Sequence, residues 1–373
     1  MLPYYYELNT MKLPMYLIQT CVLVCALMLL TQINAHEPAK KRMRADSHAP
    51  IGVMADHMHE KGEYMFSYRH MYMDMSGNEY NGSDISADSI VTTIANRFYG
   101  ASGQPAKLRV VPEKMEMHMH MIGAMYAPSD WLTLMVMTSY QEKEMTLTTY
   151  KGMMGTEVRG KFTTKSDGWG DTKISGLVKL HASSHHKLHA HLGTSLPTGS
   201  TNETDSILNP MGMTPTVRLP YGMQLGAGTY AILHGITYVG DRKKFKWGTQ
   251  YAATNYLGDD NGYTRGDKYD LTGWVSYRPI DALSGSLRVK YSDQGSISGI
   301  DSNIMLPTQA ADPRNYGGET TTILVGLNWA AQPQSPARGL RLAIEAGLPI
   351  SQNLHGLQME TDFSITSGLQ YMF

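Results

Sequence analysis

The chain carries the sequence Thr361-Asp-Phe-Ser-Ile-Thr-Ser-Gly-Leu-Gln-Tyr-Met-Phe373. Most odd-numbered positions from Phe363 to Phe373 are apolar, and most even-numbered positions are small or polar. Because successive side chains of a β-strand point to opposite faces, this period of two predicts a strand with one apolar face. We therefore expect β-structure wherever the same pattern recurs.

The same alternation recurs through most of the chain. We expect twelve strands in all, at roughly 62–74, 114–126, 131–144, 170–182, 187–198, 228–239, 245–257, 268–278, 283–293, 319–330, 339–350 and 361–373. Strands of this length, tilted near 40°, reach across the apolar band of about 25 Å that an outer-membrane barrel needs. The number and length of the strands thus suit a transmembrane wall.

The connections between these strands alternate in length. Short ones lie at 127–130, 183–186, 240–244, 279–282 and 331–338. Long ones lie at 75–113, 145–169, 199–227, 258–267, 294–318 and 351–360. Bacterial outer-membrane barrels have short periplasmic turns and long outer loops. The expected fold is all-β: a transmembrane, antiparallel, up-and-down β-barrel of about 12 strands and of outer-membrane type.

Aromatic residues mark both borders of the expected apolar belt. Beside the short turns lie Tyr238, Phe245, Trp247, Tyr277, Trp329 and Phe373, and beside the long loops lie Tyr140, Tyr230, Tyr269, Tyr291 and Phe363. A secreted β-sandwich would share the alternation, but it would not need aromatic residues at both strand ends. We therefore expect the bacterial outer membrane as the location and its lipids as the surroundings of the wall.

The small net charge of the chain argues against binding to nucleic acid. The 373 residues include 32 basic and 33 acidic side chains, which gives a formal net charge of −1. Non-specific binding to phosphate needs a clustered positive surface. We therefore expect no nucleic-acid partner.

An apolar run at 17–30 predicts a secretory signal peptide. Lys12 precedes this run and Ala35 follows it, which is the order of charge, apolar core and small residue typical of such a leader. We expect the signal peptide to span 1–35, and Met11 is an alternative start of translation. A periplasmic N-terminal segment at 36–61 and the barrel at 62–373 would follow.

Both cysteines, Cys21 and Cys25, lie within the expected leader. A processed chain would then have no thiol. Disulfide scaffolds, thiolate zinc sites and cysteine nucleophiles are therefore not expected.

Short motifs resemble a known family of outer-membrane proteins. Leu369-Gln-Tyr-Met-Phe373 resembles the C-terminal strand that the outer-membrane barrel-assembly machinery recognises, so Phe373 is expected to contact that machinery. Gly168-Trp-Gly-Asp171, with Ser195-Leu-Pro-Thr-Gly-Ser200 one hairpin later, is similar to the transporters of the MetA-pathway-of-phenol-degradation type. The stretch 49–62 resembles a Met/His-rich branch of them. The resemblance implies a barrel that moves small, often aromatic, molecules and has no catalytic residues.

The alternation also predicts which side chains line the lumen. The expected solute path consists of Arg69, Met71, Met135, Met137, Asp171, Lys173, Lys179, Arg288, Lys290, Arg341 and Glu345. Charges of both signs facing each other across a narrow barrel either brace the wall or filter solutes. Both interpretations use the same residues.

The methionine and histidine residues suggest metal binding as a second possible function. Sixteen of the 27 methionines fall between residues 54 and 154. In the stretch 115–121 we expect the methionines to face lipid and the intervening histidines to face the lumen. Thioether and imidazole are ligands that suit copper, so copper is the one metal considered, and no other cofactor is expected. The candidate ligands are His57, Met58, His59, His118 and His120.

Three functions remain open at this stage. A channel for small, hydrophobic or aromatic solutes is favoured, with a copper or soft-metal barrel as the alternative. A lipid hydrolase embedded in the barrel is less favoured, because His70 and His234 lie on apolar faces without a serine two residues away on the same strand. Recognisable hydrolase or nucleotide-binding motifs are missing from the sequence.

Overall fold

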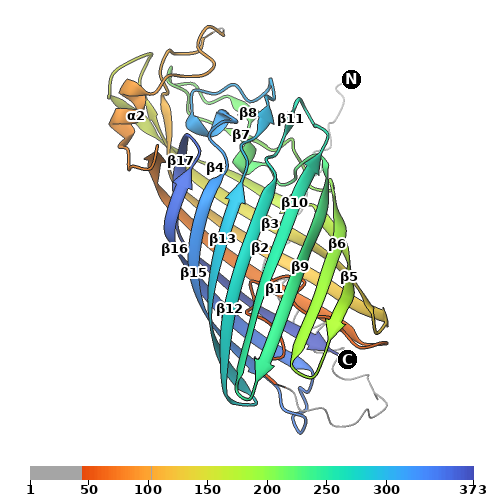
Figure 1. The fold of residues 1–373 in the computed structure, drawn as a ribbon. Helices are drawn as coiled ribbons and strands as arrows, with labels where there is room; N and C mark the ends of the chain where they lie inside the picture. Colours follow the sequence, from red (N-terminus) through yellow and green to blue (C-terminus); the bar gives the residue numbers. More distant parts are fainter. Residues whose placement is uncertain (1–43, 102) are drawn as a thin grey trace, which may run out of the picture.

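The computed structural model describes residues 44–101 and 103–373. These residues form a closed antiparallel barrel of twelve strands (Figure 1), which confirms the expected fold. The expected signal peptide and the alternative start at Met11 lie outside the described residues.

The strands of the barrel lie close to the ranges that the sequence predicts. They are β1 (Tyr64–Tyr80), β2 (Val110–Ser129), β3 (Leu132–Tyr150), β5 (Thr172–Ala182), β6 (His186–Leu196), β9 (Tyr230–Arg242), β10 (Phe245–Leu257), β12 (Lys268–Ile280), β13 (Leu283–Gln294), β15 (Gly318–Ala330), β16 (Leu340–Leu354) and β17 (Leu357–Met372). Each pairs with the next in this order, and β17 pairs with β1 to close the ring. Closure leaves the wall without an open edge.

Smaller elements gather at the end with the long loops, at the top of Figure 1. They are α2 (Ala87–Thr93), β4 (Val158–Trp169), β7 (Thr204–Ser206), β8 (Thr216–Arg218), η1 (Tyr221–Met223), β11 (Tyr263–Thr264), β14 (Ser298–Gly299) and η2 (Gln309–Ala311). Strand β4 pairs with the upper half of β3, whose lower half pairs with β5. The loop predicted at 351–360 is instead a tight turn at 355–356, because β16 and β17 run longer than the alternation indicated.

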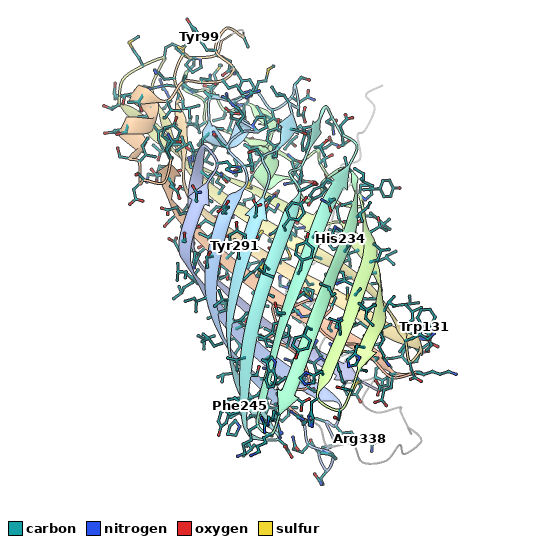
Figure 2. All side chains as sticks on the ribbon, viewed as in Figure 1. Tyr99, Trp131, His234, Phe245, Tyr291 and Arg338 are labelled. Atoms are coloured by element: carbon teal, nitrogen blue, oxygen red, sulfur yellow. The ribbon has the colours of Figure 1, made fainter. Side chains whose placement is uncertain are left out.

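The outer face of the barrel is apolar and bordered by aromatic residues. Phe245 and Tyr277 are exposed beside the short turns, and Tyr230 and Tyr291 beside the long loops. Figure 2 shows Phe245 and Trp131 projecting from the wall near the short turns. Such a belt with two aromatic borders is the surface that lipid covers, so the barrel is one of the outer membrane.

No helix among the described residues is long and apolar enough to cross a membrane.

Candidate functional site: a methionine-lined lumen and its plug

Residues 44–61, called the plug below, run inside the barrel at the end with the short turns. We expected residues 36–61 in the periplasm; the structure describes 44–61 of them and places much of this part against the inner wall. Ala49, Ile51 and Val53 are almost fully buried, and Ala49 and Val53 pack on Val239 and Trp274 of the wall. Removal of these apolar side chains from water stabilises the segment inside the lumen.

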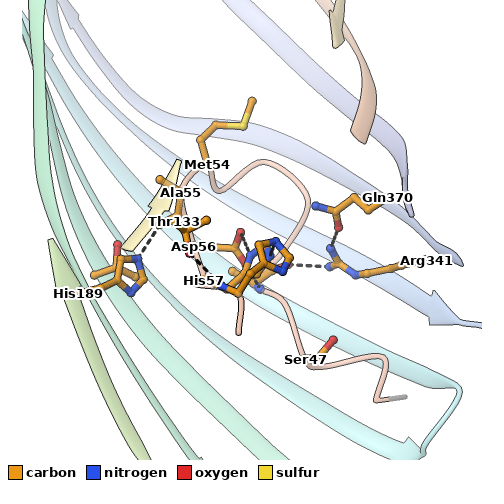
Figure 3. A network of polar contacts seen from close by, with 12 residues as sticks. Ser47, Met54, Ala55, Asp56, His57, Thr133, His189, Arg341 and Gln370 are labelled. Carbon is orange, nitrogen blue, oxygen red and sulfur yellow. Dashed lines mark hydrogen bonds and ion pairs between the residues drawn. The ribbon is translucent and has the colours of Figure 1, made fainter. Parts of the chain in front are cut away.

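Polar side chains of the wall bind the backbone of the plug. Arg341 donates a hydrogen bond to the carbonyl of Ala49 at 2.7 Å, and Gln250 donates to that of Met54 at 2.8 Å. His189 Nε2 lies 2.8 Å from the carbonyl oxygen of Ala55. Figure 3 shows Arg341 and His189 reaching the plug from different parts of the wall. These carbonyl groups are buried and do not pair within a β-sheet, so the side chains of the wall provide their hydrogen-bond donors.

The charged residues of the lumen brace the structure around the plug. Arg288 forms two hydrogen bonds with Glu345, at 2.9 and 2.7 Å, and both side chains are buried. Glu345 also accepts a bond from the amide of Gly52 at 3.1 Å. Lys290 pairs with Asp270 at 3.2 Å. The geometry therefore favours bracing for the Arg288 pair, because its charges are already satisfied.

Ten of the predicted lumen residues lie on the inner face of a strand. They are Arg69, Met71, Met135, Met137, Lys173, Lys179, Arg288, Lys290, Arg341 and Glu345, as the strand registers show. The eleventh, Asp171, directly precedes β5. Lys179 is exposed near the short-turn end. Asp171, near the other end, accepts bonds from the amides of Gly199 and Ala227 at 2.9 and 2.8 Å. The lumen residues therefore fall into groups at different heights.

The orientation expected for residues 115–121 is wrong. Strand β2 pairs with β1 so that Met119 lies opposite Met71 and Met117 opposite Met73. Neighbours directly opposite in an antiparallel pair share a face, so these methionines point into the lumen. The inner faces of β1, β2 and β3 together carry Met65, Met71, Met73, Met75, Met115, Met117, Met119, Met121, Met125, Met135, Met137 and Met145. We call this set the methionine track.

His118 and His120 correspondingly lie on the outer face. His118 Nδ1 is 3.1 Å from His70 Nε2, and His120 Nδ1 is 2.7 Å from the hydroxyl of Tyr68. The Nδ1 atom of each histidine, which we expected in the lumen, thus has a partner on the lipid side. Because these rings point outward, they do not join the histidines of the plug.

A second segment enters the lumen from the end with the long loops. In the loop 197–229, Leu219, Tyr221 and Met223 are fully buried. Lys143 of β3 donates bonds to the carbonyls of Gly222 and Gln224 at 3.0 and 2.7 Å. Met223 and Leu219 pack against the upper part of the methionine track. The track therefore runs between this loop and the plug.

The candidate metal ligands of the plug separate into two groups. His57 Nε2 lies 3.2 Å from His59 Nε2, whereas Met58 packs with the apolar cluster around Ala55 and Met65. His48, which the sequence did not single out, stacks edge-on against His57 with ring centroids 3.9 Å apart. The structure thus brings three imidazoles together.

Burial keeps the imidazoles of His48 and His57 neutral. Burial lowers the pKa of His57 to about 4, although the adjacent carboxylate of Asp56 opposes the shift. Burial also holds the pKa of His48 well below its usual range. Burial disfavours the ionised form of Asp56, but contacts with His57 and with the amide of Ala49 outweigh it and hold its pKa well below the usual range.

Several other residues that contact the plug were harder to predict from the sequence. Trp274 points inward onto the plug, in the space that Gly248 leaves open: a Cβ at Gly248 would come within 2.3 Å of the indole. Gln250 and Thr133 face the plug but are ordinary polar residues of a strand. The alternation placed these side chains on the inner face, but it could not say that a segment of the same chain would fill the lumen.

Comparisons with known proteins support the fold. No family model matches the chain, and no curated protein matches it. An outer membrane channel from Pseudomonas putida F1 is similar in structure, with a TM-score of 0.57 and 14% identity over 87% of this chain and 100% of that one. The Pseudomonas putida toluene transporter TodX has a TM-score of 0.41 at 10% identity, over 84% of this chain and 90% of that one. The first likeness agrees with the barrel described above.

Proposed function

We propose that this barrel is an outer-membrane channel for small, hydrophobic or aromatic solutes. The observation that carries the proposal is the methionine track, which forms one wall of the lumen along β1, β2 and β3. Methionine is unbranched and polarizable, so a row of thioethers offers adaptable apolar contact to solutes of different shape. A water-filled pore for polar solutes would not need such a lining.

The track is continuous from one end of the lumen to the other. Near the long loops, Met115 and Met145 belong to a buried cluster with Met223 of the inserted loop. Near the short turns, Met65 and Met125 belong to a buried cluster with Ala55 of the plug. Between these clusters, Met71, Met73, Met117, Met119 and Met137 are only partly buried, whereas Met121 is buried. A solute would therefore meet thioethers along the whole path, while the lumen residues Lys173, Lys290 and Arg69 would supply polar contacts.

Two segments lie in the path in this structure. The plug is bound to the wall at the short-turn end, and the loop 197–229 is bound to β3 toward the other end. Transport then requires that one or both segments move, so these segments are gates in the proposal. Such gating suits a selective channel better than an open porin.

Transport is favoured over catalysis on the outer face. His234 Nε2 lies 3.0 Å from Asn255 Oδ1, which is the kind of pair that a hydrolase embedded in the barrel would need. However, Ile232 and Ile236 occupy the positions two residues away on the same strand, and Ala253 lies directly opposite His234. None of these three positions beside His234 therefore carries a serine or threonine hydroxyl that it could activate.

Flux through purified protein in liposomes tests the proposal. Replacing Met119 and Met137 by Ser makes the middle of the track polar, and we expect uptake of a radiolabelled monoaromatic solute to fall at least tenfold. Val136→Ala is the matched control, because this neighbouring side chain faces lipid. Unchanged aromatic uptake in the double variant, with the fold verified by heat-modifiable migration, would refute an apolar path along the track.

A further inference from the structure

We propose that the plug holds a copper site built on His57 and His59, with His48 beside His57. This inference goes beyond solute transport, because it concerns a resident ion held by the gate rather than the cargo. Among the described residues, His48, Asp56 and His57 form the group whose ligand atoms lie within 4.8 Å of one another.

The spacing of two ring nitrogens matches that of two ligands on one metal ion. His57 Nε2 and His59 Nε2 are 3.2 Å apart. Metal–nitrogen bonds of about 2.0–2.1 Å at a tetrahedral angle place two nitrogens about 3.3 Å apart. An ion can therefore bridge these atoms with little movement of the rings.

The opposite nitrogens of both rings face carboxylates. His57 Nδ1 lies 2.8 Å from Asp56 Oδ1, and His59 Nδ1 lies 3.4 Å from Glu63 Oε2. Histidines that bind a metal usually donate their other ring N–H to a carboxylate or carbonyl, which fixes the tautomer and the ring orientation. Asp56 and Glu63 are thus positioning residues: with a proton on Nδ1 of each ring, both Nε2 lone pairs would point at the ion.

His48 lies next to His57 and has a buried nitrogen without a partner. Its ring is more than nine-tenths buried, and Nδ1 has no hydrogen-bond partner among the described residues. Buried polar atoms are rarely left without a partner, and a bound ion is one of the reasons that explain such a case. The edge-on contact with His57 keeps this ring within the group.

The surroundings favour copper over zinc. A cavity of about 10 Å³ borders His57 but not His48 or His59, and its wall side carries Met65, Met125 and Met135 together with Arg69. This volume is close to the roughly 10–15 Å³ that one water-sized particle needs. Imidazole suits copper and zinc alike, whereas the soft thioethers beside His57 favour Cu⁺.

Metal titration of the purified full chain in detergent tests the proposal. The thiols of Cys21 and Cys25 are first blocked by alkylation, so that they cannot bind the metal. Cu⁺ is then titrated against a chromogenic chelator, and Zn²⁺ is titrated in parallel. We expect one tightly bound copper per chain, with His57→Asn and His59→Asn each weakening its binding at least 100-fold. The control His234→Asn, on the outer face, should bind like the original protein.

Two further variants keep the result interpretable. Asp56→Asn retains the shape of the carboxylate, and we expect it to weaken copper binding about 10–100-fold, the usual effect of losing a partner that orients a ligand. The double variant His118→Asn/His120→Asn asks whether copper binds on the outer face instead. Correct folding of each variant is checked by heat-modifiable migration, and Cu²⁺-loaded protein should show nitrogen hyperfine lines in its electron paramagnetic resonance spectrum.

Three results would overturn the proposal. One is unchanged copper binding in folded His57→Asn and His59→Asn. Another is loss of copper in the outer-face double variant but not in the plug variants. The third is a site that holds Zn²⁺ more tightly than Cu⁺.

Discussion

Arg341 and Ala49 are 292 residues apart in sequence, yet the guanidinium of Arg341 donates to the carbonyl of Ala49 at 2.7 Å. The same side chain bonds Asn328 at 2.5 Å and also contacts Gln370. Arg341 thus joins the plug to two neighbours in the wall. Because all these groups are buried and the donor is charged, the arginine is a strong connection between the barrel and the plug.

Replacing this arginine should open the channel. We expect Arg341→Gln to raise single-channel conductance in planar bilayers severalfold, because the Ala49 carbonyl loses its charged donor and the plug is released more often. Arg338→Gln is the matched control, since Arg338 is exposed in the turn before β16. Equal conductance of the two variants would show that Arg341 does not hold the plug.

The buried pair Arg288–Glu345 should matter for stability. Glu345→Gln leaves a buried guanidinium without its counter-charge, and breaking such a pair typically costs about 3–5 kcal/mol. We expect the temperature at which the barrel loses its heat-modifiable form to fall clearly. The double variant Arg288→Met/Glu345→Leu removes both charges and should recover most of the loss. A double variant as unstable as the single one would contradict this account.

Acidification should release the plug. Burial lowers the pKa of His57 from its ordinary value of 6.5 to about 4, so the buried ring is neutral where a solvated ring would bind a proton. The stability that this neutral ring contributes is complete above pH 6.5 and is lost as the pH falls toward 4. The loss is on the order of 3 kcal/mol for a shift of this size.

Limited proteolysis of the plug against pH measures this effect. The groups facing His57 are Asp56, His48, His59 and Arg341. Cleavage within 44–61 should increase between pH 6.5 and 4 in the original protein and depend less on pH in His57→Gln. If the two proteins had the same pH profile, a group other than His57 would control the release of the plug.

Closure of the barrel should depend on the C-terminal strand. Tyr64 and Phe373 exchange two backbone hydrogen bonds at 3.0 Å, and Leu369 faces lipid beside Tyr68. We expect Leu369→Asp, or deletion of Phe373, to abolish assembly in the outer membrane, because an acid on the lipid face costs up to a few kcal/mol and the expected contact with the assembly machinery is lost. Heat-modifiable migration of membrane fractions reports assembly.

Gln370→Glu is the control for this prediction. Residue 370 lies on the inner face beside Arg341, where an added negative charge has a partner. This variant should assemble normally. Normal assembly of Leu369→Asp as well would show that the lipid face tolerates the acid.

The sequence by itself determined the wall of this protein. Alternation at 361–373 and its recurrences fixed the strands, their number and the inner position of residues such as Arg288, Glu345 and Met137. These features are local, because the period of two follows from the geometry of an extended backbone. The aromatic borders and the unequal loop lengths then indicated that the outer face of the wall contacts lipid.

Only the tertiary structure decided what fills the lumen and which way residues 115–121 face. Alternation divides a strand into two faces but does not say which one is inside when both carry chemically mixed residues. His118 lies outside with His70 of the neighbouring strand, and Met119 lies inside because β2 pairs with β1 in the register that sets it opposite Met71. Likewise, His48 joins His57 only through the path of the plug, since contacts between residues far apart in sequence depend on how the whole chain folds.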